Sequence, residues 1–210
     1  MMKKLGLTFG VLVLSGCTQM TAQQESQSAV EATSTTTTAT AGTTAAVAAA
    51  QAQAQACQGD VSLPQGIAAH FEPTDDPALL SSALGEPEQG KLCQGQVYQS
   101  KSDAKVVLFR AWNSTNPNSQ FGQWWAFHQP SGKIAAYRSD YEICYQWSPL
   151  DKLVSCTLKP GTKVVVGNGQ SAKCSAYLTY PASEKQQVYL VDAANAVMDC
   201  SVYDGVMSWQ

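Results

Sequence analysis

The run Lys105-Val106-Val107-Leu108-Phe109-Arg110-Ala111-Trp112 is the clearest strand in this 210-residue chain. Side chains alternate between the two faces of a strand, and here both faces are apolar except for Arg110. Strands that are apolar on both faces lie inside a domain, so we predict a central strand of a sheet. The neighbouring segments must then cover both of its faces.

The segment after this strand predicts a second strand. A polar loop (113–120) leads into Gly122-Gln123-Trp124-Trp125-Ala126-Phe127, which is rich in the aromatic residues that strands favour. Two interpretations of the next segment stay open. Pro130-Ser131-Gly132 favours a hairpin with a strand at 133–138. We prefer an amphipathic helix over about 131–146, because apolar residues recur there at intervals of three and four.

Turn and capping residues place the other elements. Asp76, Pro77 and Gly85 have the positions of a helix cap, a first turn and a helix stop. Lys159-Pro160-Gly161 predicts a hairpin between two strands, and Gly167-Asn168-Gly169 predicts a break after them. The predicted strands of this region are 153–158, 162–166, 187–191, 197–203 and 206–209. Together these elements predict an α+β fold with a mostly antiparallel sheet and short helices, stabilised by disulfides.

The first 17 residues resemble the signal peptide of bacterial lipoproteins. Lys3 and Lys4 precede a short apolar run that ends in Leu14-Ser15-Gly16-Cys17, similar to a lipobox. The resemblance implies that residues 1–16 are removed, that Cys17 carries acyl chains into a membrane, and that the domain is held at the bacterial outer membrane. In that case it would lie in the periplasm or at the cell surface.

The cysteine count agrees with this assignment. The chain has seven cysteines, and assigning one to lipid leaves an even number for disulfides in an oxidising compartment. The six are Cys57, Cys93, Cys144, Cys156, Cys174 and Cys200. None forms a C-x-x-C pair, so we predict no metal site, and 15 pairings stay open from the sequence.

Residues 17–56 form the predicted lipidated N-terminus and linker. They are rich in Thr, Ala and Gln and contain no aromatic residue, so we expect a disordered tether ahead of a folded domain at 57–210. The whole chain carries a net charge of -3 and has no cluster of Lys and Arg, which argues against binding to nucleic acid.

Arg110 is one of two arginines in the chain and sits in an otherwise apolar strand. A buried guanidinium must be paired. One interpretation is an ion pair with Asp140 or Glu142, or a strand end that reaches solvent. The other is a planar donor group held for a phosphate or carboxylate ligand.

Trp124 and Trp125 point to opposite faces if they lie on a strand. One should pack in the core, and the other offers a flat surface for a ring or a sugar. Packing of both in the core is the alternative.

The order of three elements distantly resembles the ADP-ribosyltransferase and NAD-glycohydrolase folds. The matching residues are Phe109-Arg110, the Gly122-containing strand with Trp124 and Trp125, and Ser183 to Leu190 with Gln187 at the critical place. The resemblance implies that Arg110 holds the diphosphate of NAD, that the Gly122 strand lines the nicotinamide pocket, and that Gln187 bonds the ribose. It departs at Ala126, where a hydroxyl residue is usual.

Two functional hypotheses follow. The first is a lipid-anchored envelope domain that binds an envelope protein, a glycan or a host surface, with no cofactor. The second is an enzyme that binds or consumes NAD as its substrate, with Arg110 and Gln187 as its catalytic residues. His70 and His128 have no partners in sequence that would indicate a catalytic base, and no serine-hydrolase or zinc-protease motif is present.

Overall fold

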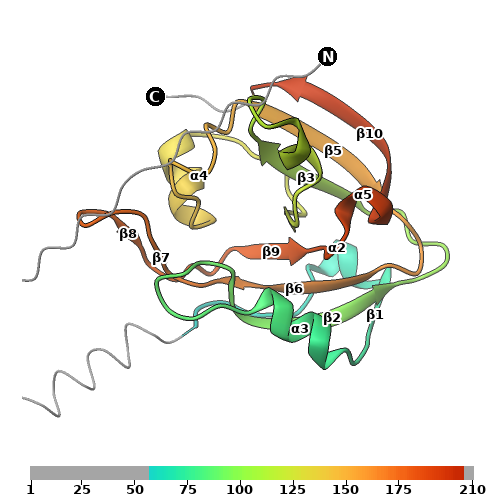
Figure 1. The fold of residues 1–210 in the computed structure, drawn as a ribbon. Coiled ribbons are helices and arrows are strands. Elements are labelled where there is room, and N and C mark those ends of the chain that lie inside the picture. The colour runs from blue at the N-terminus through green and yellow to red at the C-terminus, as the bar shows by residue number, and fades with distance from the viewer. Residues whose placement is uncertain (1–56, 206–210) are drawn as a thin grey trace, which may run out of the picture. The chain divides into compact units, whose positions relative to one another are not determined.

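The computed structural model describes residues 57–205, which form an α+β fold of antiparallel sheets, as the sequence predicts (Figure 1). The predicted signal peptide (1–16), the linker (17–56) with Cys17, and the strand at 206–209 lie outside the described residues. No helix within 57–205 is long and apolar enough to cross a membrane.

The strands form three sheets, in each of which all neighbours are antiparallel. The five-stranded sheet has the order β1 (Phe71–Pro73), β2 (Leu92–Ser100), β6 (Lys163–Gly169), β9 (Gln186–Tyr189) and β4 (Trp124–Trp125). The three-stranded sheet has the order β10 (Val197–Asp204), β5 (Lys152–Leu158) and β3 (Val107–Trp112). A small hairpin pairs β7 (Ala172–Lys173) with β8 (Thr179–Tyr180).

The helices are short. They are α2 (Gln65–Ala68), α3 (Pro77–Ala83), α4 (Ile134–Asp140), α5 (Ala193–Ala196) and the 3-10 helix η1 (Pro117–Phe121). The predicted start of α3 is confirmed, because the Asp76 carboxylate accepts a hydrogen bond from the Leu79 N–H at 3.1 Å. The helix ends at Ala83, before the predicted stop at Gly85.

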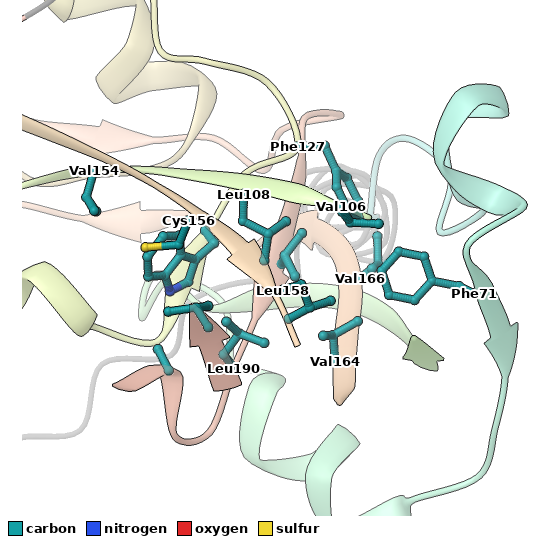
Figure 2. Close-up of a cluster of buried hydrophobic side chains, with 14 of the residues drawn as sticks. Phe71, Val106, Leu108, Phe127, Val154, Cys156, Leu158, Val164, Val166 and Leu190 are labelled. Atoms are coloured by element: carbon teal, nitrogen blue, oxygen red, sulfur yellow. The ribbon is translucent and has the colours of Figure 1, made fainter. Parts of the chain in front are cut away.

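The main core lies between the two larger sheets (Figure 2). Leu108 and Leu158 of the three-stranded sheet lie near Val164 and Val166 of the five-stranded sheet, and all four are fully buried. Burial of each such side chain stabilises the fold by about 1.5–3 kcal/mol. The apolar faces that the sequence predicts therefore hold the two sheets together.

The predicted hairpin of residues 153–158 and 162–166 is wrong. The chain does turn at Gly161, with φ 75°, but β5 pairs with β3 and β10 while β6 pairs with β2 and β9. The hydroxyl of Ser100 contacts the carbonyls of Lys159 and Thr162 across this connection. β5 and β6 do not pair with each other because they belong to different sheets, and the main core lies between those sheets.

The predicted break at residues 167–169 is also wrong, since β6 continues through Gly169. The glycines there serve close packing. A Cβ on Gly167 would overlap the Gln94 carbonyl of the neighbouring strand, and Asn168 is fully buried and hydrogen-bonded to Gln94 and Glu184.

The first strand is confirmed over 107–112, but it is not central in its sheet. β5 holds the central place, and the other edge of β3 meets the segment after β4 through a bridge between Phe109 and Ala126. The second strand shrinks accordingly to Trp124–Trp125. A cavity occupies the space beside this edge of β3.

The helix predicted at 131–146 exists but is shorter, and the alternative hairpin is wrong. α4 ends at Asp140 because Glu142 adopts φ 48°, in the left-handed region that a helix cannot continue through.

The six cysteines form three disulfides, which confirms that they are all paired. The pairs are Cys57–Cys93, Cys144–Cys174 and Cys156–Cys200. The last joins neighbouring strands β5 and β10, and the second ties the loop after α4 to the residue that follows β7.

Candidate functional site

A cavity of about 190 Å³ opens beside β3, β4 and β9 and is closed by α4 and the loop after it. An apolar cavity of roughly 150 Å³ holds one benzene-sized group, so this one has room for a single ring. Its polar and aromatic lining includes Arg110, Trp124, Tyr137, Glu142, Trp147 and Gln187.

Arg110 reaches the cavity from β3. Its Nε donates to the Ser119 carbonyl at 2.8 Å, and its Nη1 donates to the Trp124 carbonyl at 2.6 Å. The predicted ion pair with Asp140 or Glu142 is wrong, because the ion pairs within 57–205 do not include Arg110. Burial lowers the pKa of Arg110 to about 10, so the side chain is still a cation at neutral pH.

Gly122 explains how the guanidinium fits. The Cα of Gly122 lies against it, and a Cβ there would come within 2.7 Å of the Arg110 Cζ. Gly122 has φ -65°, which any residue adopts, so the glycine is needed for space and not for backbone freedom. Gly122 thus packs directly against the guanidinium of Arg110, and a side chain at this position would displace it.

The two tryptophans pack against different hydrophobic clusters, Trp125 within the main core and Trp124 against the cluster that contains Tyr189. Trp125 is 2% exposed and packs in the main core, where its indole N–H donates to the Gly122 carbonyl at 2.7 Å. Trp124 is half-buried and packs against Tyr189 in a tilted arrangement, with ring centroids 4.9 Å apart and an interplanar angle of 53°. Both line the cavity, and Trp124 is the more exposed of the two.

Gln187 comes from β9 and is 7% exposed. Its Nε2 donates to the Glu142 Oε2 at 2.8 Å. Gln187 and Arg110, separated by 77 positions in the chain, therefore line the same cavity. The sequence predicts both of them as site residues.

Sequence reasoning named Glu142 only as an ion-pair partner of Arg110 and missed its contact with Gln187 in the site. Its side chain is 2% exposed, and its Oε1 has no hydrogen-bond partner among the described residues. Burial raises the pKa of Glu142 to about 9, against smaller opposing effects of the hydrogen bonds from Gln187 and from the Ser183 backbone. The carboxyl group is therefore uncharged at neutral pH. An acid between Tyr141 and Ile143 was the available signal.

The second arginine holds the loop that carries Glu142. Arg138 donates through Nη1 to the carbonyls of Ile143 and Cys144, at 3.3 and 3.4 Å, and through Nη2 to that of Ser148 at 2.6 Å. With the Cys144–Cys174 disulfide, these bonds fix the wall of the cavity opposite β3.

The described residues offer no group of three or more His, Cys, Asp and Glu side chains that could hold a metal ion. The cavity instead combines a cation, a half-buried aromatic face and a buried amide–carboxyl pair. Such a set can bind an anionic group and a flat ring at once and can direct hydrogen bonds to a polar group between them.

No family model matches the chain, and no curated protein matches it. A solved structure described as Tne2 in complex with Tni2 matches with 14% sequence identity and a TM-score of 0.37, covering 58% of this chain and 99% of that one. Similarity of this extent carries no argument about activity, and the site has to be interpreted from its own geometry.

Proposed function

We propose that the cavity takes the nicotinamide end of an NAD-type dinucleotide and that the bond between this ring and the adjoining ribose is cleaved there. The observation that carries the proposal is that Arg110 and Gln187 line one ring-sized cavity together with Trp124. Cleavage of this bond releases nicotinamide with the bonding electron pair, water adds at the ribose carbon, and one proton passes to solvent.

Arg110 supplies the contact to phosphate in this proposal. A guanidinium has five N–H donors, and two of those in Arg110 bind backbone carbonyls. The remaining three have no acceptor among the described residues. A charged donor group held in a fixed plane suits the diphosphate, and its anchoring to two carbonyls means that little side-chain entropy is lost on binding.

Trp124 supplies the face for the ring, and Gln187 supplies the hydrogen bond to the ribose. The uncharged Glu142 adds no negative charge at neutral pH, so the positive charge that develops on the ribose carbon is stabilised by dipoles alone. That arrangement favours slow hydrolysis over rapid transfer to another protein.

The predicted lipid anchor and outer-membrane location concern residues outside the described part of the chain, and they stay predictions. They are compatible with an enzyme, since an anchor fixes where the cavity acts and not what it binds. Mass spectrometry of mature protein tests the anchor through acyl chains on Cys17.

The test of the function is incubation of the purified protein with NAD, followed by chromatography of nicotinamide. We expect release by the wild type and none by Arg110→Ala with an unchanged circular dichroism spectrum. Lys105→Ala is the matched control, because it removes an exposed cation just ahead of the same strand, away from the cavity.

Two other outcomes would contradict the proposal in different ways. Absence of release together with no NAD-induced rise in the wild-type melting temperature would remove NAD as the ligand. A rise without release would leave a binding protein without the hydrolytic activity.

A further inference from the structure

The amide of Gln187 has one end fixed inside the protein. Its Nε2 donates to the Glu142 Oε2 at 2.8 Å, and both side chains are at least nine-tenths buried. Within residues 57–205 no donor contacts its carbonyl oxygen. Since the nitrogen is turned toward Glu142, the oxygen is the end of the amide left for a ligand.

Glu142 has a rigid setting for this contact. Its carboxyl group lies against Gly169, where any side chain on β6 would overlap it. Its own backbone has φ 48°, a conformation that costs a non-glycine residue energy and is kept only where the surroundings enforce it. Arg138 and the disulfide of Cys144 hold the residues that follow.

We propose that Glu142 is a positioning residue that fixes the Gln187 amide with its carbonyl oxygen toward the cavity. The ligand group at this point is then a hydrogen-bond donor, and a ribose hydroxyl of the dinucleotide is such a group. The identity of the hydroxyl-bearing ligand rests on the proposed function, whereas the orientation of the amide does not.

The charge around the pair favours this arrangement. Asp140 disfavours ionisation of Glu142, and Arg110 and Lys91 are the cations that line the same cavity, beside Tyr137 and Tyr141. An uncharged Glu142 carries its proton on Oε1, because Oε2 already accepts from Gln187. Oε2 then serves as a neutral acceptor and leaves the nitrogen of Gln187 bound.

Two variants of Glu142 separate positioning from packing. Glu142→Gln keeps the shape of the side chain and an acceptor oxygen. Glu142→Leu keeps most of the side-chain volume but removes the acceptor. The first readout is the side-chain amide resonance of Gln187 in NMR, assigned with Gln187→Leu. We expect it to be similar in the wild type and Glu142→Gln and clearly moved in Glu142→Leu.

The second readout compares the dissociation constants of NAD and of NAD analogues that lack one hydroxyl on the nicotinamide ribose. We expect the wild type and Glu142→Gln to bind one of these analogues about tenfold more weakly than NAD, the size of one lost hydrogen bond. Glu142→Leu should bind both about equally, with NAD weakened and the analogue little affected.

If the side-chain amide resonance of Gln187 is unchanged by every substitution at Glu142, the positioning role is overturned, even if NAD is cleaved. Equal wild-type affinity for NAD and every deoxy analogue would overturn it as well. If the resonance moves as expected but NAD neither binds nor reacts, the proposed function fails and the amide orientation stands.

Discussion

The carboxyl group of Glu142 occupies the space that a side chain on residue 169 would need, so Gly169 and Glu142 fit together as one unit. The two residues come from β6 and from the loop after α4, which have no pairing with each other in the chain's sheets. Their fit ties the wall of the cavity to the five-stranded sheet.

Substitution of Gly169 by Ala should destabilise the protein, because the added methyl group displaces the buried carboxyl group. We expect a loss of about 1–3 kcal/mol in the free energy of unfolding, the usual cost of overpacking. Urea denaturation measures it. Gly66→Ala is the control, since nothing lies within 4 Å of the added Cβ there. The double variant Gly169→Ala/Glu142→Ala should recover part of the loss, and strict additivity would refute the contact.

The stability difference between the wild type and Glu142→Gln should depend on pH. The pKa of Glu142 rises from 4.5 to about 9 on folding, so between these values the folded state binds a proton that the unfolded state has released. The stability contributed by this group is complete below about pH 4.5 and falls as the pH rises toward 9.

Relative to Glu142→Gln, the wild type should therefore lose on the order of 2–4 kcal/mol between pH 5 and pH 8, at up to about 1.4 kcal/mol per pH unit. Other acids titrate alike in both proteins and cancel in the difference. Unfolding free energies from denaturant titrations at several pH values check this. A constant difference would show that Glu142 is ionised in the folded protein.

Gly122→Ala should weaken ligand binding and, like Gly169→Ala, lower the free energy of unfolding by about 1–3 kcal/mol without loss of the fold. The backbone accommodates alanine at φ -65°, so the change acts through the Cβ, which displaces the guanidinium of Arg110. We expect nicotinamide release to fall at least tenfold. Gly132→Ala does not serve as a control because its φ of 78° strains any side chain, so Gly66→Ala is used again. Unchanged release would show that Arg110 is not needed in its present place.

Reduction of the disulfides should lower the melting temperature sharply. In the chain-entropy description a bridge across 30 residues, as between Cys144 and Cys174, contributes on the order of 3–4 kcal/mol. The paired variant Cys144→Ala/Cys174→Ala should also weaken ligand binding, because this bridge holds the loop with Glu142. Cys156→Ala/Cys200→Ala, which opens β5 from β10 away from the cavity, should lower stability and leave affinity unchanged. Equal loss of affinity in both would contradict this assignment.

The class of the fold and several candidate site residues can be predicted from the sequence, because they follow from local features. The cap at Asp76, the apolar faces of 105–112 and the lone arginine in that strand are all local features. Arg110 and the two tryptophans could be named as candidates from such features, whereas Gln187 came only from the resemblance to the NAD-glycohydrolase folds, and the roles of all four await the tests above.

The sequence does not predict which strands pair with one another or which distant side chains come into contact. The turn at Lys159-Pro160-Gly161 reverses the chain, but nothing in those residues states that β5 and β6 belong to different sheets. In the sequence, Gly167 and Gly169 are typical of a chain break. In the structure, they allow the neighbouring strand and the Glu142 side chain to approach β6 closely. The contact of Glu142 with Gln187 was missed for the same reason, since only the fold brings the two residues together.

The bridge from Cys57 to Cys93 also determines how the domain resists a mechanical pull. Tension applied to the chain ahead of residue 57 passes through the sulfur atoms directly into β2, an interior strand of the five-stranded sheet. Residues 58–92, with α2, β1 and α3, are bypassed and bear none of it. Extraction by force from this end therefore cannot begin by peeling away β1, the first strand of the sheet.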